Sequence, residues 1–174
     1  MSASAGNGDG RIRVAYIDDQ LLFREAVASV LESQGQVTIA YSASHHHDNF
    51  SALRNGCAEV VLIGLDMQIR DPIATVREAR IALPELPICA LVAADRLERA
   101  REAILLGCRG AVSTAASVTV LVAALQNLAD GQPYVDATLG GRLLAKTISR
   151  TTLRQNSGPN GKKFLAEAGD ISKN

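Results

Sequence analysis

Two adjacent carboxylates, Asp18 and Asp19, directly follow the apolar run 14–17, where a buried strand is predicted to end and a helical repeat to begin. Open parallel α/β sheets bind their ligands at this carboxyl-terminal edge. The pair could therefore line a pocket, where each carboxylate raises the pKa of the other unless a cation compensates. Arg70 is a candidate for that cation. In the alternative interpretation, Asp19 only caps the helix that follows.

A second polar cluster, His45-His46-His47-Asp48, lies where the loop after the second predicted strand enters a helix. Three successive histidines cannot all face one metal ion, so the sequence favours a solvated loop or helix start. Weak metal binding at the surface and a pH-sensitive patch stay open as alternatives. Gly-rich phosphate loops and a Ser-His-Asp order are not recognisable. We therefore expect neither catalytic residues nor a small-molecule substrate.

The elements that must position these residues alternate along the chain. Apolar runs typical of buried strands lie at 14–17, 37–41, 59–63, 87–92 and 110–112. Helices are predicted at 21–35, 49–53, 72–82, 95–107 and 117–128. Pro72 falls in the first turn of the third helix, and Asp95 is the predicted N-cap of the fourth. Five such βα units predict a flavodoxin-like, doubly wound five-stranded parallel sheet with helices on both faces.

Length and composition suit one domain of this class. The 174 residues are 47% hydrophobic and contain no Trp, so the core is built from Ala, Val, Leu and Ile. The sequence has no apolar run long enough to cross a bilayer, and its first ten residues lack the hydrophobic segment of a signal peptide. Three cysteines at unrelated spacings (Cys57, Cys89 and Cys108) favour reduced thiols. We therefore expect a cytoplasmic protein without a membrane segment.

The neutral net charge hides an asymmetry between the two parts of the chain. Residues 1–141 carry 11 basic and 16 acidic side chains, whereas residues 142–174 carry 7 basic and 2 acidic ones. Every lysine lies at or after Lys146. The basic segment could contact nucleic acid through phosphates, but Phe164 is its only aromatic residue and the signal is weak.

Three segments together resemble the receiver domain of bacterial response regulators: V-A-Y-I-D-D at 14–19, V-V-L-I-G-L-D-M-Q at 60–68 and G-C-R-G at 107–110. The resemblance covers about residues 11–150 and implies a CheY-like fold. The segment after Pro133 is similar to the linker helix of the NarL/LuxR class of these regulators. In the family, an acidic pair holds Mg²⁺ beside an aspartate that becomes an acyl phosphate.

The same resemblance places the functional positions of the family on residues that lack the required groups. The acceptor aspartate falls on Gly64, and Met67, three residues on, supports that register. The hydroxyl that binds the phosphoryl group falls on Val92, the lysine on Thr114 and the switching aromatic on Ala111. The resemblance therefore implies a pseudo-receiver that lacks the phosphoacceptor and has no cofactor, with weak Mg²⁺ binding by Asp18 and Asp19 at most.

Two alternatives remain beside this interpretation. Asp66 follows Gly64 by two residues and would point to the same side of an extended strand, so it could be a displaced acceptor in a phosphorelay. An enzyme that uses the Asp18/Asp19 pocket is the third hypothesis. The acidic pocket under consideration is therefore Asp18, Asp19, Gly64, Asp66, Val92 and Thr114.

The helix at 117–128 is apolar around most of its circumference. One stripe (Val120, Ala123, Ala124 and Leu128) is predicted to face the core, which would leave Val118, Leu121 and Leu125 toward a flank. These three residues are the predicted interface of a homodimer or of a complex with another regulatory protein. In the alternative they pack on the linker helix.

The predicted organisation is a disordered lead-in at 1–10, a receiver-like domain at 11–131, a linker helix at 132–150 and a basic, largely disordered tail at 151–174. The end of that tail faintly resembles the start of a helix-turn-helix domain. We expect signal transduction and transcriptional regulation through protein–protein contacts, without phosphorylation. DNA binding is not expected from the receiver itself.

Overall fold

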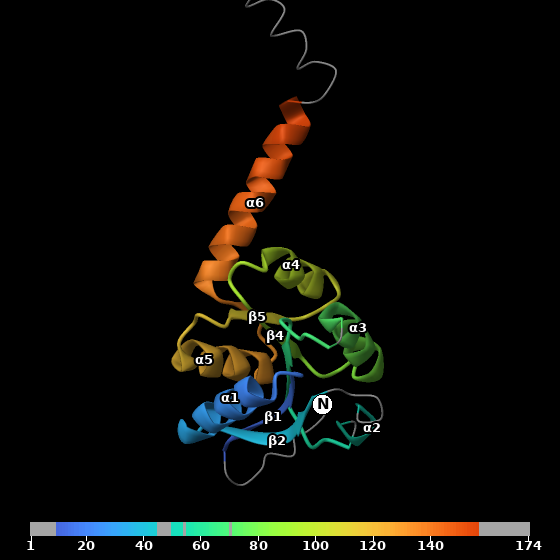
Figure 1. The fold of residues 1–174 in the computed structure, drawn as a ribbon, viewed down its shortest axis with the longest axis vertical. Coiled ribbons are helices and arrows are strands. Elements are labelled where there is room, and N and C mark those ends of the chain that lie inside the picture. Colours follow the sequence, from blue (N-terminus) through green and yellow to red (C-terminus); the bar gives the residue numbers. More distant parts are fainter. Residues whose placement is uncertain (1–9, 45–49, 54, 70, 157–174) are drawn as a thin grey trace, which may run out of the picture. The chain divides into compact units, whose positions relative to one another are not determined.

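The computed structural model describes residues 10–44, 50–53, 55–69 and 71–156. Within them, six parallel strands form one sheet in the order β2-β1-β3-β4-β5-β6 (Figure 1). The strands are β1 (Ile12–Ile17), β2 (Val37–Ala43), β3 (Val60–Gly64), β4 (Ile88–Val92), β5 (Gly110–Ser113) and β6 (Tyr134–Val135). The helices are α1 (Leu21–Ser33), α2 (Phe50–Leu53), α3 (Pro72–Ala82), α4 (Leu97–Leu105), α5 (Val118–Ala129) and α6 (Ala137–Asn156).

Helices cover both faces of this sheet. Helices α1 and α5 contact each other on one face, while α3 contacts both α2 and α4 on the other (Figure 1). Every residue of β3 and β4 is buried as a result, which explains their continuous apolar sequence. The predicted flavodoxin-like, doubly wound fold is confirmed.

The order of the strands brings the two candidate segments together. Strand β1 lies between β2 and β3, so the chain reverses its direction of progress across the sheet at this point. Ile17 pairs with Ile63 in the register of β1 and β3. Asp18 and Gly64, the next residues along these two strands, therefore lie side by side where such folds bind ligands.

The short strand β6 was not predicted, because residues 132–136 were assigned to the linker helix. Tyr134 and Val135 pair with β5 instead, and the helix starts only at Ala137. Asp136 explains this start. Its buried carboxylate accepts hydrogen bonds from the main-chain N–H groups of Thr138 and Leu139, at 2.8 and 3.1 Å, and also from Ser113 N. This aspartate therefore caps α6 and joins its start to β5.

Two predictions about helices α4 and α5 are wrong. Asp95 is not the N-cap of α4: the helix begins one residue later, after Arg96, because buried Leu97 and Ala100 must face the sheet. Leu121 and Leu125 do not lie on an exposed flank of α5. They are 7% and 0% exposed and belong to the core beneath α1 and α5, because an all-round apolar helix does not reveal which side packs. Their predicted role as an interface is therefore not supported by their positions.

The chain divides into two compact units, residues 1–139 and 140–174. The first contains the sheet and helices α1 to α5. In the second, α6 continues to Asn156, beyond the predicted end of the linker helix at residue 150. The residues outside the described ranges include residues 1–9 of the predicted lead-in, the cluster His45-His46-His47-Asp48, the candidate cation Arg70 and residues 157–174 of the predicted tail. In the described residues, none of the helices has the length and apolar character needed to span a membrane.

Candidate functional site

The carboxylate of Asp18 is buried at the end of β1 and is only 1% exposed. Its Oδ1 accepts a hydrogen bond from Gln20 N at 2.9 Å, and its Oδ2 accepts one from the Tyr16 hydroxyl at 3.3 Å. Burial raises the pKa of Asp18 above its ordinary value, and the charge of Asp19 adds to this rise. The hydrogen bonds from Gln20 and Tyr16 and the charge of Arg24 act in the opposite direction. Burial thus favours the protonated form of this carboxyl group.

The neighbouring Asp19 contacts a different part of the chain. Its carboxylate accepts hydrogen bonds from two main-chain N–H groups of the loop after β3, from Gln68 at 2.9 Å and from Ile69 at 2.6 Å. The N-cap of α1 is Gln20, so the alternative in which Asp19 caps that helix is wrong. The two adjacent carboxylates therefore have separate partners, and in the described part of the chain no group of three His, Cys, Asp or Glu side chains is placed to hold a metal ion.

Gly64 ends β3 directly against Asp18. A Cβ atom built on Gly64 would lie 2.0 Å from Asp18 Oδ2 and 2.6 Å from Asp18 Cγ. Contacts this short are sterically impossible without movement of Asp18. The carboxylate of Asp18 thus occupies the space into which a side chain at position 64 would project.

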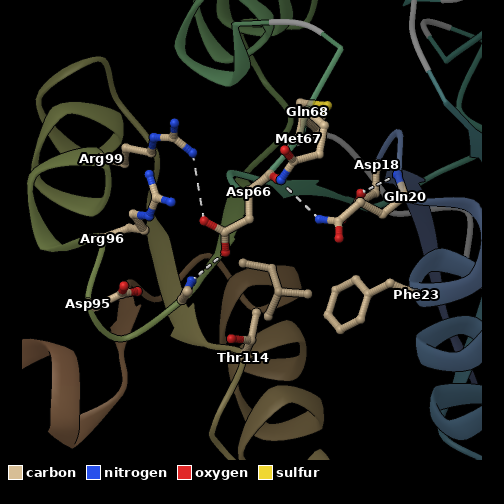
Figure 2. A pocket seen from close by; sticks show the side chains of 12 residues that line it. Asp18, Gln20, Phe23, Asp66, Met67, Gln68, Asp95, Arg96, Arg99 and Thr114 are labelled. Carbon is tan, nitrogen blue, oxygen red and sulfur yellow. Dashed lines mark hydrogen bonds and ion pairs between the residues drawn. The ribbon is translucent and has the colours of Figure 1, made fainter.

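Asp66 is fixed with its side chain toward the cavity at this edge of the sheet (Figure 2). Its Oδ2 accepts a hydrogen bond from Ala93 N at 2.6 Å, and its Oδ1 lies 3.7 Å from Arg99 Nη1. Arg99 Nη1 also donates to the carbonyl of Leu65 at 2.7 Å. The main-chain oxygen of Asp66 accepts hydrogen bonds from the side-chain amides of Gln20 and Gln68. Asp66 therefore connects the loop after β3 with the loop after β4 and with α4.

The other positions given by the resemblance lie at the ends of β4 and β5. Val92 and Ala111 are fully buried within the sheet. Thr114 follows β5, its N–H donates to Val92 O at 2.9 Å, and its exposed side chain lines the cavity together with Asp18 and Asp66. Of the six residues of the predicted acidic pocket, Asp18, Asp66 and Thr114 line the cavity, whereas Asp19, Gly64 and Val92 do not.

The cavity has a volume of about 540 Å³, and several of its lining residues were missed in the sequence. Gln20 and Gln68 contribute amides, Arg96 and Arg99 contribute guanidinium groups, and Phe23 forms an apolar wall. Arg96 is the N-cap of α4 and Arg99 lies in its first turn, so two arginines three residues apart at the start of a predicted helix are a signal that the sequence contains. Which face of α4 turns to the cavity is decided by its packing on the sheet.

The cysteines lie outside the cavity, and Cys57, Cys89 and Cys108 form no disulfide. Burial raises the pKa of Cys108 to about 12 and also raises the pKa of Cys89. Both thiols are therefore protonated at neutral pH and unreactive as nucleophiles.

The chain is similar in sequence to bacterial transcriptional regulators. It is 26% identical over 138 residues to the uncharacterized transcriptional regulatory protein YxjL of Bacillus subtilis (strain 168), and the matched segment covers 79% of this chain and 63% of the relative. It is 30% identical over 99 residues to the transcriptional regulatory protein ZraR of Salmonella typhimurium, covering 56% and 22% of the two chains. The chain thus spans less than two thirds of the length of these curated relatives. No protein-family model matches it.

Solved structures similar to this one are response regulators. A two-component response regulator of the LuxR family from Aurantimonas sp. SI85-9A1 has a TM-score of 0.71 and 17% identity, and the match covers 79% of this chain and 99% of that chain. The isolated REC domain of RcsB from Salmonella enterica serovar Typhimurium has a TM-score of 0.61 and 21% identity, covering 76% and 98%. At these identities the comparison establishes the fold, which is that of a CheY-like receiver domain. The structural neighbours thus support the resemblance to a receiver domain in its fold, and the sequence relatives support a similarity to bacterial transcriptional regulators.

Proposed function

We propose that this chain is an atypical receiver that acts in signal transduction and transcriptional regulation through protein–protein contacts, without phosphorylation and without enzymatic activity. The observation that carries the proposal is the contact between Gly64 and Asp18. The position of the acceptor has no carboxylate, and the space for one is occupied by the side chain of Asp18. The absence of an acceptor side chain at position 64 therefore coincides with packing that leaves no space for one.

The groups that would bind a phosphoryl group are missing as well. Val92 offers no hydroxyl, and Thr114 offers no charge where the family has lysine. Residues 1–141 contain no lysine that could replace it. With Asp19 bound to the loop after β3, the acidic pair is also not assembled for Mg²⁺. These features support a receiver that signals through its folded surface.

A surface suited to a protein partner lies between α1 and α5. An apolar groove of about 230 Å³ is lined by residues of both helices, among them Phe23, Val27, Val30 and Val118. Val30 is 46% exposed, and Leu22 on the same helix is 82% exposed. We propose that a second copy of this chain binds here, so that Val118 stays in the interface while Leu121 supports it from the core. The location that we propose is cytoplasmic, because the three cysteines form no disulfide.

One observation favours the second candidate, a phosphorylatable receiver with Asp66 as acceptor, because this side chain does face the cavity. Its geometry argues against that role. Asp66 Oδ2 already accepts the Ala93 N–H at 2.6 Å and Oδ1 faces Arg99, so both oxygens of the carboxylate already contact other groups of the protein.

Acetyl phosphate treatment of the full chain with Mg²⁺, followed by intact-mass measurement, tests the two candidates. We expect no added phosphoryl group, because Gly64 has no nucleophile and Asp66 is engaged. A mass gain that disappears in Asp66→Asn but persists in the control Asp95→Asn would establish Asp66 as acceptor and refute the proposal.

A further inference from the structure

We infer that the cavity between β1, β3, β4 and α4 binds a small organic anion non-covalently, with Arg96 as its main anchor. The ligand class is a carboxylate or phosphate monoester with an apolar body. This inference goes beyond the proposed function and does not depend on it, because reversible anion binding requires neither an acceptor residue nor a protein partner.

The acidic side chains of the cavity are already used as acceptors within the protein. Asp18 is buried and accepts bonds from Gln20 N and the Tyr16 hydroxyl. Asp66 accepts the Ala93 N–H and faces the Arg99 guanidinium. These bonds use part of the acceptor capacity of both carboxylates, and among the described residues no three His, Cys, Asp or Glu side chains are grouped to hold a metal ion. Despite its three aspartates, the cavity is therefore poorly suited to a metal.

The lining groups that remain unengaged in the described part of the chain include one cationic donor, the guanidinium of Arg96, beside acceptors such as the Asp95 carboxylate. The guanidinium of Arg96 makes no hydrogen bond or ion pair there, and Figure 2 shows it beside the cavity, near Arg99. The exposed hydroxyl of Thr114 lies on the side formed by β5. A guanidinium that lacks a counter-ion favours carboxylates and phosphates, which it binds through paired N–H donors.

Asp95 is the remaining carboxylate of the lining, and it is exposed to solvent. Its charge opposes an anion and would favour a cation. The sign of its effect on binding therefore distinguishes the two ligand classes, which makes Asp95 a useful site for a variant.

The size and the apolar wall of the cavity define the rest of the ligand. A volume of about 540 Å³ lies in the range of small-molecule sites. Phe23 and Leu91 contribute apolar surface to the lining, and Figure 2 shows Phe23 on the side of the cavity opposite Arg96 and Arg99. An anion with an aromatic or aliphatic body would bury that surface while its charged end contacts Arg96.

Amide chemical shifts of the full chain, titrated separately with phenyl phosphate and with phenylacetate in EDTA at constant NaCl, test the inference. We expect saturable shifts centred on the amides of Ala93, Arg96 and Thr114 with at least one of the two probes. Arg96→Gln should weaken binding about tenfold, the size of one charge-assisted hydrogen bond. The control Arg101→Gln, on an exposed position of the same helix, should bind like the parent.

Asp95→Asn should tighten binding, because it removes a repulsive charge. The inference is overturned if neither probe gives saturable shifts, if Arg96→Gln and Arg101→Gln bind alike, or if Asp95→Asn weakens binding. Binding that appears only when Mg²⁺ replaces EDTA would also overturn it, because the site would then be a metal site. Intact mass after the titration separates this result from the previous one: a covalent phosphoryl group would contradict the proposed function, whereas reversible shifts without mass gain support the anion site.

Discussion

At the end of β3, Gly64 leaves a space that the carboxylate of Asp18 fills. The distance of 2.0 Å between a Cβ atom placed at position 64 and Asp18 Oδ2 means that even a methyl group does not fit. The carboxylate cannot simply turn away, because Gln20 N and the Tyr16 hydroxyl hold its two oxygens. Restoring an aspartate at position 64 would therefore displace Asp18 and not recreate an acidic pocket.

Gly64→Ala should lower the free energy of unfolding by about 1–3 kcal/mol, the usual cost of overpacking. The loss should be smaller in an Asp18→Ala background, because the two changes act on the same contact. Urea denaturation of the parent, the single variants and the double variant measures this coupling. Gly141→Ala is the control, since no atom lies within 4 Å of a Cβ there. Equal losses in both backgrounds would show that the contact with Asp18 is not the cause.

The pKa of Asp18 gives stability a pH dependence of defined sign. Because burial raises this pKa in the folded state, the ionised carboxylate costs stability at neutral pH, and the cost disappears as the group becomes protonated. Asp18→Asn should therefore unfold at higher temperature than the parent at pH 7. The difference should vanish below about pH 4, where the aspartate is neutral in both states.

Thermal unfolding of both proteins between pH 3.5 and pH 8 measures this difference, and about 1 kcal/mol would move Tm by about 2–4 °C in a chain of this length. Asp130→Asn, at the exposed end of α5, is a matched control. A parent that is more stable than Asp18→Asn at every pH would contradict the sign of the argument.

Among the elements, strands β1 to β5 could be predicted from the sequence, whereas β6 and the core-facing side of α5 could not. β3 and β4 are buried on both sides, so their composition alone identifies them. α5 is apolar around most of its surface, so its sequence does not distinguish Leu121 and Leu125, which face the core, from half-buried Val120. Only contact with both the sheet and α1 decides the orientation.

Some features of the site follow from the local sequence, whereas others depend on contacts with distant residues. The positions of Asp18, Gly64 and Thr114 at one edge follow from the order of the strands, which a βα pattern predicts. The separation of Asp18 from Asp19 does not follow, because Asp19 is held by N–H groups of Gln68 and Ile69, about 50 residues away. Asp136 is an intermediate case: its type and its place before a helix are typical of an N-cap, but its link to β5 depends on the fold.

For the whole molecule, a receiver that acts without phosphorylation, as we propose for this chain, has consequences for assembly. By the resemblance, Val92 and Ala111 take the positions of the hydroxyl and the aromatic that change position in phosphorylated receivers, and both residues are fully buried. If phosphorylation does not switch the binding surface of the receiver, that surface should bind its partner constitutively. The apolar groove between α1 and α5 is the part of the first unit that best suits a second copy. The chain should therefore form a constitutive dimer through this face.

Val30→Glu places a charge in the groove at a residue that is 46% exposed in the single chain. The variant should stay folded but dissociate at least about tenfold more easily, because burying an unpaired charge in an interface is unfavourable. Leu105→Glu, at a 70% exposed residue of α4, should dimerise like the parent. Sedimentation of all three proteins over a range of concentrations decides between the faces. If only Leu105→Glu dissociates the dimer, the interface lies on α4 and not in the groove. If the parent is monomeric at high micromolar concentration, the partner of this receiver is another regulatory protein and not a second copy.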